Sequence, residues 1–91
     1  MSVLIRFAPA SLTAKQYDES VRRLKEAGVF PPDGLDYHVC FGTDGSLKVS
    51  EIWDTREQLD AFGKYLMPIL ADVGIESGVP EIIEIHNVVR R

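Results

Sequence analysis

Cysteine and long apolar runs are scarce in this chain of 91 residues. It has one cysteine, Cys40, which excludes an internal disulfide and a cysteine-based zinc site. No apolar run approaches the ~20 residues that a membrane-spanning helix needs, so we expect no membrane partner. No basic segment followed by an apolar core precedes Val3. These absences predict a reduced, cytoplasmic setting.

Positive charge is also scarce. The chain has 10 Lys and Arg against 14 Asp and Glu, which gives a net charge of −4, and its only basic cluster is Arg90-Arg91. Nucleic acids and anionic membranes bind clustered Lys and Arg, so the composition argues against both kinds of partner. The sequence contains no Ser/His/Asp pattern typical of a catalytic triad, no phosphate-binding loop and no paired metal-ligand motif. We therefore expect no cofactor and no metal site.

The length of the chain predicts a single domain over residues 1–91. A domain of this size buries only roughly 60 to 65% of the surface of its unfolded chain, so stabilisation by a partner is expected. The apolar pattern predicts strands over residues 3–7, 35–41, 47–53 and 81–89. It also predicts a helix after the first strand and a longer helix after the third.

The first helix has clear start and stop signals. Thr13 and Gln16 are spaced as a capping box, in which each side chain binds the backbone amide of the other residue. Gly28 followed by Val29 predicts a Schellman ending, with the glycine in the left-handed conformation. The residues at helical spacing that form its predicted buried stripe are Ala14, Tyr17, Val21 and Leu24.

The dipeptide Asp44-Gly45 predicts a two-residue hairpin turn of type I′, which needs positive φ at both positions. The turn fixes the register of the two flanking strands, whereas a three-residue bulged turn would break it. The pairs placed opposite each other on one face are Asp36 with Trp53, His38 with Glu51, and Cys40 with Val49.

The second helix starts at Asp54 or Thr55, since each has a capping partner three residues further on, and the cap is left open. Pro68 lies inside its apolar pattern and cannot donate a backbone hydrogen bond. We therefore expect a bend or a break at this residue. The β-rich stretch from Glu81 to Val89 predicts a long final strand.

The two halves of the chain follow one plan of strand, capped helix, glycine turn and strand. Two such units predict the ferredoxin-like order βαββαβ, an α+β fold with a four-stranded antiparallel sheet. Because crossovers are right-handed, both helices are expected on the same face of that sheet.

Strand alternation divides the sheet residues between a helix-covered face and an open face. The residues expected under the helices are Val3, Ile5, Phe7, Tyr37, Val39, Phe41, Ile52, Ile83 and Ile85. Those expected on the open face are Leu4, Arg6, His38, Cys40, Val49, Glu51, Trp53, Ile82, Glu84, His86 and Val88. The open face is both apolar and polar, which predicts a homodimer that packs sheet on sheet and encloses a partly polar cavity.

This plan, with a strand that ends in Trp53-Asp54-Thr55-Arg56-Glu57 ahead of the second helix, resembles the dimeric α+β barrel proteins, including the antibiotic-biosynthesis-monooxygenase-like group. The resemblance implies a dimer whose sheets close into a barrel, and a small aromatic ligand or haem as the molecule acted upon. Cofactor-independent oxygenases of the group have an Asn four residues before the junction Trp, where this chain has Val49. Haem-degrading members use a His on the second helix, and this chain has none there.

The candidate catalytic residues are His38, Glu51 and His86, and the candidate ligand-binding residues are Arg6, Trp53, Val49 and Leu4. A carboxylate opposite an imidazole fixes its tautomer and raises its basicity, as a general base requires. One hypothesis is a cofactor-free oxygenase or isomerase that acts on a small apolar or aromatic molecule. The other is a non-catalytic homodimeric module whose polar residues satisfy one another. An enclosed pocket of roughly 300 Å³ or more would favour the enzyme.

Overall fold

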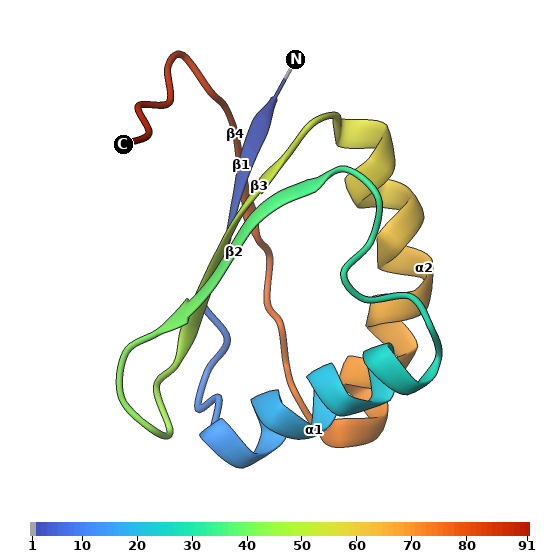
Figure 1. The fold of residues 1–91 in the computed structure, drawn as a ribbon. Coiled ribbons are helices and arrows are strands. Elements are labelled where there is room, and N and C mark those ends of the chain that lie inside the picture. Colours follow the sequence, from blue (N-terminus) through green and yellow to red (C-terminus); the bar gives the residue numbers. More distant parts are fainter. Residues whose placement is uncertain (1) are drawn as a thin grey trace.

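The computed structural model describes residues 2–91 and contains a four-stranded sheet with two helices. In chain order the elements are β1 (Val3–Phe7), α1 (Ala14–Glu26), β2 (Leu35–Phe41), β3 (Lys48–Trp53), α2 (Arg56–Val73) and β4 (Glu81–Glu84). The strand order is β2-β3-β1-β4, with every neighbouring pair antiparallel. Both helices lie on the same side of the sheet (Figure 1). The predicted ferredoxin-like fold is therefore confirmed.

Helix α1 begins and ends as its sequence predicts. Thr13 is the N-cap, and its side chain and that of Gln16 form the capping box. The tip of the β2–β3 hairpin also contacts this end, because Asp44 Oδ1 accepts a hydrogen bond of 2.9 Å from the Ala14 amide. At the other end Gly28 has a φ of 75°, and the Val29 amide donates to a carbonyl in the last turn of the helix.

Helix α2 begins after Thr55, whose hydroxyl accepts a hydrogen bond of 3.2 Å from the Gln58 amide. Thr55 is thus the cap, rather than Asp54. The sequence predicts a bend or a break at Pro68. The helix continues through this residue to Val73, so no break occurs. Leu59 and Phe62 of α2 are buried in the core, and this packing holds the helix in place despite the missing amide donor.

The β2–β3 hairpin has the predicted register from Tyr37 to Phe41, including His38 opposite Glu51. The type I′ turn is wrong, because Gly45 has a φ of 89° but Asp44 is not among the residues with positive φ. The Ser46 amide still donates to the Thr43 carbonyl at 2.8 Å, so the loop length and the register are kept.

The register also shifts at the start of β2, where Leu35 rather than Asp36 lies opposite Trp53. The extra residue forms a bulge between Leu35 and Tyr37. The amide of Asp54 donates to the Gly34 carbonyl at 2.8 Å, which continues the pairing beyond the bulge.

The last strand is shorter than predicted and ends at Glu84 instead of Val89. Its only neighbour in the sheet is β1, and Val3 lies opposite Glu84, where β1 begins. One further hydrogen bond, from the Ile85 amide to the Ser2 carbonyl, follows this pair. Within residues 2–91 no strand is left for the following residues to pair with, so the β-rich sequence does not extend the sheet.

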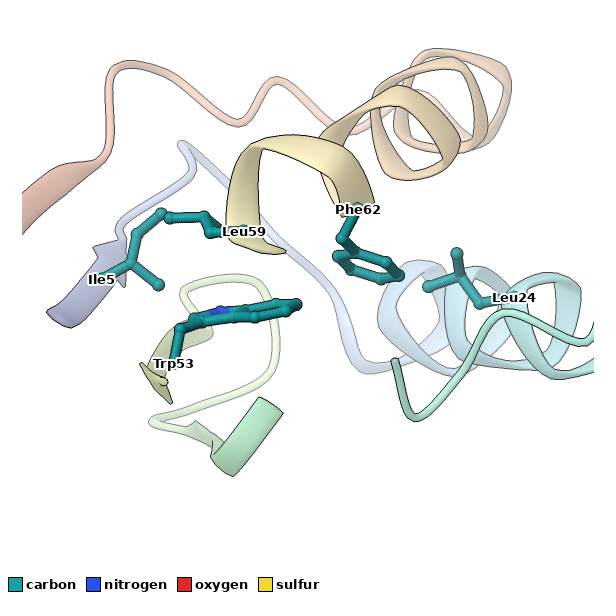
Figure 2. Packing of buried hydrophobic residues seen from close by; sticks show 5 residues of the cluster. All are labelled: Ile5, Leu24, Trp53, Leu59 and Phe62. Carbon is teal, nitrogen blue, oxygen red and sulfur yellow. The ribbon is translucent and has the colours of Figure 1, made fainter. Parts of the chain in front are cut away.

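The two faces of the sheet differ from the prediction for three of the four strands. Trp53 is 0% exposed and packs against Phe62 of α2, with ring centroids 5.6 Å apart (Figure 2). Since Ile5 lies opposite Glu51 and Val3 opposite Trp53, these residues share the helix-covered face. Hence β1 is placed correctly, whereas the expected faces of β2, β3 and β4 are exchanged.

The physical reason for this exchange is that Glu51 is polar but lies in the core. The prediction assigned it to the open face by polarity, and its neighbours on β2 and β3 followed through the hairpin register. The apolar residues that the exchange moves to the open face are Tyr37, Val39, Phe41, Ile52 and Ile83, which join Leu4 and Arg6 there. The residues moved under the helices are His38, Cys40, Val49, Glu51, Trp53, Ile82 and Glu84.

Candidate functional site

A cavity of about 60 Å³ lies between the helices and the sheet. Its wall is mostly apolar and is formed by both helices, by β1, β2 and β3, and by loop residues such as Pro9 and Ile75. Five polar residues also line it: Tyr17, Ser20, His38, Glu51 and Ser77. This cavity is therefore on the helix-covered face, and the prediction that His38, Glu51 and Val49 line a cavity on the open face is wrong.

Three hydrogen bonds join four side chains beside this cavity. Trp53 Nε1 donates to Glu51 Oε1 at 3.1 Å, and Glu51 Oε2 lies 2.5 Å from His38 Nδ1. The second ring nitrogen, His38 Nε2, lies 2.6 Å from the Tyr17 hydroxyl. These hydrogen bonds run from the end of β3 across β2 to α1, and we call the four linked side chains the Tyr17–Trp53 chain.

The donors and acceptors of the Tyr17–Trp53 chain match in one arrangement. A carboxylate that is only 3% exposed must be paired, and Glu51 accepts from Trp53 and from His38. His38 then carries its proton on Nδ1, and Nε2 accepts from the Tyr17 hydroxyl. A charged His38 would instead donate from both nitrogens. The hydroxyl hydrogen of Tyr17 would then have no acceptor among the other three side chains of the Tyr17–Trp53 chain. The geometry therefore favours a neutral His38.

Burial is the main cause that raises the pKa of Tyr17 to about 12, and Cys40 and Glu51 nearby add to the effect. Tyr17 is consequently protonated at neutral pH and able to donate to His38. Aromatic contacts also hold the imidazole ring. The Tyr17 ring stacks on it at 5.9 Å, and the Phe30 ring meets it edge to face at 5.6 Å.

The structure brings together four of the seven predicted site residues. His38, Glu51 and Val49 line the cavity, and Trp53 binds Glu51 from the core beside it. The pairing of His38 with Glu51, which the hairpin register predicts, is confirmed by their hydrogen bond.

The other three predicted site residues lie elsewhere. Leu4 and Arg6 alternate with Ile5 and so point to the open face, on the far side of the sheet. His86 follows the end of β4, where it is exposed and does not line the cavity. The predicted convergence of His86 with His38 and Glu51 is therefore wrong, because the final strand ends before it.

The hydrogen bond of Tyr17 to His38 is not predicted from the sequence, which places Tyr17 in the core without a polar role. A phenol on the buried stripe of an amphipathic helix needs a hydrogen-bond partner, which was the available signal. Its partner could not be named, because nothing local in the sequence relates α1 to β2. Among residues 2–91 no group of three or more His, Cys, Asp and Glu side chains is arranged to hold a metal ion.

Comparison with known proteins supports the fold. No protein-family model matches the chain, and no curated protein matches it. Solved structures do match, and the class they define is the antibiotic biosynthesis monooxygenase-like fold. At identities below 20% this likeness shows the fold and confirms the predicted resemblance at that level.

Three of these structures cover almost the whole chain. A variant of SnoaB, a cofactor-independent oxygenase from Streptomyces nogalater, has a TM-score of 0.69 and 12% identity over 99% of this chain and 98% of that one. A proposed antibiotic biosynthesis monooxygenase from Deinococcus radiodurans has a TM-score of 0.64 and 12% identity over 100% and 98%. Rv0793 from Mycobacterium tuberculosis has a TM-score of 0.56 and 19% identity over 98% and 97%.

Proposed function

We propose that the protein binds a small apolar or aromatic molecule in the cavity between helices and sheet, and that His38 and Glu51 supply a base there. The observation that carries the proposal is the Tyr17–Trp53 chain, which places an imidazole backed by a carboxylate at an apolar cavity. Such a site suits the removal of a proton from a ligand that the apolar walls bind.

Removal of a proton is the first step of the two reaction types considered, an isomerase and a cofactor-independent oxygenase. The carboxylate of Glu51 keeps the His38 tautomer fixed and stabilises the imidazolium that forms when a proton arrives. The similarity in fold to a structure named as a cofactor-independent oxygenase supports this class of chemistry. Fold alone does not define a reaction, so the site carries the proposal.

The cavity of about 60 Å³ is smaller than the roughly 300–1,000 Å³ of pockets for drug-sized ligands. An aromatic ligand therefore requires the walls to move apart. Part of the wall is made by Ile75 and Ser77, which lie in the segment 75–80 between α2 and β4. This segment has neither helix nor strand, so its displacement breaks little regular hydrogen bonding.

We further propose that the protein forms a homodimer through the open face of the sheet. Large apolar side chains are exposed there, including Tyr37 at 51% and Ile83 at 46%. Neither helix covers this face (Figure 1). A patch of this kind is typical of an interaction surface.

The second candidate function is a non-catalytic homodimeric module that binds a ligand or only assembles. The small cavity favours it, as does the complete pairing of the polar groups, since no buried side-chain nitrogen or oxygen in the described residues lacks a partner. In that case the Tyr17–Trp53 chain serves stability alone.

Two small probes distinguish these functions. Indane tests binding, and 2-indanone, which has acidic C–H groups, tests proton removal through deuterium uptake from heavy water measured by NMR. We expect both to bind and 2-indanone to exchange faster with the protein than with buffer. Val49→Phe, which fills the cavity, should abolish both effects, whereas Val89→Phe at an exposed position after β4 should not. Binding without faster exchange would favour the module, and no binding would contradict the proposal.

A further inference from the structure

The hydrogen bonds of the Tyr17–Trp53 chain run in one direction, from a residue that only donates to a residue that can still accept. Trp53 can only donate, so its indole begins the chain and fixes the orientation of the Glu51 carboxylate. Both ring nitrogens of His38 are then engaged, one by Glu51 and one by Tyr17. The oxygen of Tyr17 ends the chain, and it retains the capacity to accept a hydrogen bond.

We propose that Tyr17, rather than His38, meets the ligand and relays its proton to His38. The acidic O–H or C–H bond of the ligand breaks as its proton moves to Tyr17 Oη, and the original Oη–H bond breaks as that proton moves to His38 Nε2. The ligand is left as an anion, Tyr17 as a neutral phenol, and His38 as an imidazolium beside the Glu51 carboxylate. The inference rests on the proposed function and names the proton-transferring residue of that site.

The geometry prevents His38 from acting alone. Its Nε2 lone pair points to the Tyr17 hydroxyl at 2.6 Å, and its Nδ1 points to Glu51 at 2.5 Å. Aromatic rings also cover it on two sides, Tyr17 by stacking and Phe30 by its edge. A ligand in the cavity reaches the basic nitrogen only through the Tyr17 hydroxyl.

The electrostatics of Tyr17 fit a relay and not a free phenolate. Burial and neighbouring groups raise the pKa of Tyr17 to about 12, which disfavours loss of its proton on its own. In a relay the hydroxyl gains one proton as it loses another, so no phenolate forms. The site therefore selects a small apolar molecule that has one acidic O–H or C–H group, with Glu51 and Trp53 as positioning residues.

A ligand-free measurement tests the premise of the relay. Nitrogen-15 NMR of the His38 ring at neutral pH should show a neutral ring with its proton on Nδ1. Glu51→Gln should reverse this tautomer, because the new amide can donate to Nδ1 and force the proton to Nε2. An imidazolium in the wild type, or a proton on Nε2, would overturn the relay whether or not any ligand binds.

A second measurement uses 4-nitrophenol, whose phenolate absorbs visible light. The quenching of Trp53, the single tryptophan, reports binding independently of ionisation. With the wild type, we expect bound 4-nitrophenol to be half ionised at a pH about 1 unit or more below its value in buffer, since the imidazolium stabilises the anion. Tyr17→Phe should bind the probe and lose this shift, and Tyr65→Phe, at an exposed site on α2, should keep it.

The two measurements separate the failure of the relay from the failure of the site. A shift that persists in Tyr17→Phe shows that His38 takes the proton directly and overturns the relay, while the proposed function stands. A wild type that does not bind 4-nitrophenol, indane or 2-indanone contradicts the proposed function. The His38 tautomer then still decides whether the side chains are arranged as a relay.

Discussion

Glu51 is a carboxylate in the core, and its partners determine whether it is tolerated there. It accepts hydrogen bonds from Trp53 and His38 while its side chain is 4% exposed. A buried charge of this kind is costly unless it is paired, and its removal leaves its partners unpaired in turn. The stability of the core and the proposed proton transfer in the cavity thus depend on the same atoms of Glu51.

Glu51→Ala should therefore lower the free energy of unfolding by about 2 to 4 kcal/mol, because it leaves the Trp53 and His38 donors without an acceptor and enlarges the cavity. Denaturant melts measure this loss. Glu76→Ala, which removes an exposed carboxylate after α2, is the matched control and should change stability by less than about 0.5 kcal/mol. Similar small effects in both variants would show that the Tyr17–Trp53 chain adds nothing to stability.

Tyr17 should make the stability of the protein fall at high pH. Its pKa is about 12 in the folded protein, against 10.0 for an ordinary tyrosine, so the unfolded chain loses this proton first. The contribution is intact below pH 10 and is lost as the pH rises toward 12, by about 1 to 2 kcal/mol after allowance for partial exposure. Melts of the wild type and Tyr17→Phe from pH 9 to 12 would show it as a steeper decline in the wild type. Parallel declines would contradict the raised pKa.

Local signals in the sequence predict the ends of the first helix and the register of the hairpin, but not the type of its turn. Thr13 with Gln16 and Gly28 with Val29 act within a few residues, so their geometry follows from the residues themselves. The hairpin register is equally local, because the loop length alone pairs His38 with Glu51. Of the Tyr17–Trp53 chain, the contact between His38 and Glu51 could be predicted in this way.

The remainder depends on contacts between distant segments, which no local signal specifies. No local signal shows that Ile5 lies opposite Glu51, and this one pairing decides which residues of the hairpin lie on the helix-covered face. The contact of Tyr17 with His38 likewise depends on how α1 packs on the sheet. The early end of β4 follows from the position at which β1 begins. Polarity is a poor guide to burial where a charged residue is fully paired, as Glu51 is.

Pro68 provides a test at the level of one helix. It is exposed within α2, and its missing amide leaves the Lys64 carbonyl without its usual helical donor. Because the helix is continuous there, Pro68→Ala should restore this hydrogen bond and stabilise the protein by about 1 to 3 kcal/mol. Thermal and denaturant melts measure the gain, and Met67→Ala, at the exposed neighbouring position, controls for the change of side chain. A loss of stability would mean that the chain around residue 68 is adapted to proline.

The whole molecule has one uncovered layer, the open face of the sheet. The residues on it include Leu4, Tyr37, Phe41, Ile52 and Ile83, and the helices lie on the other side (Figure 1). A chain of this length buries a modest share of its surface by itself, so the proposed association through this face would add stability that the single layer lacks. Since the cavity lies on the opposite face, association and ligand binding can be altered separately.

Light scattering at micromolar concentration should therefore give the mass of a dimer. Ile83→Glu places a charge on the open face, within the proposed interface, and should weaken dimerisation by about 30-fold or more, the effect of removing an interface hot spot. Met67→Glu, a matched change at an equally exposed position on α2, should leave the dimer intact because it lies on the helical side.

The binding of indane to Ile83→Glu then decides whether the cavity needs the partner. Undiminished binding to the monomer is expected, because the cavity lies on the helix-covered face and not on the proposed interface. A monomeric wild type, or equal effects of the two substitutions, would contradict assembly through the open face.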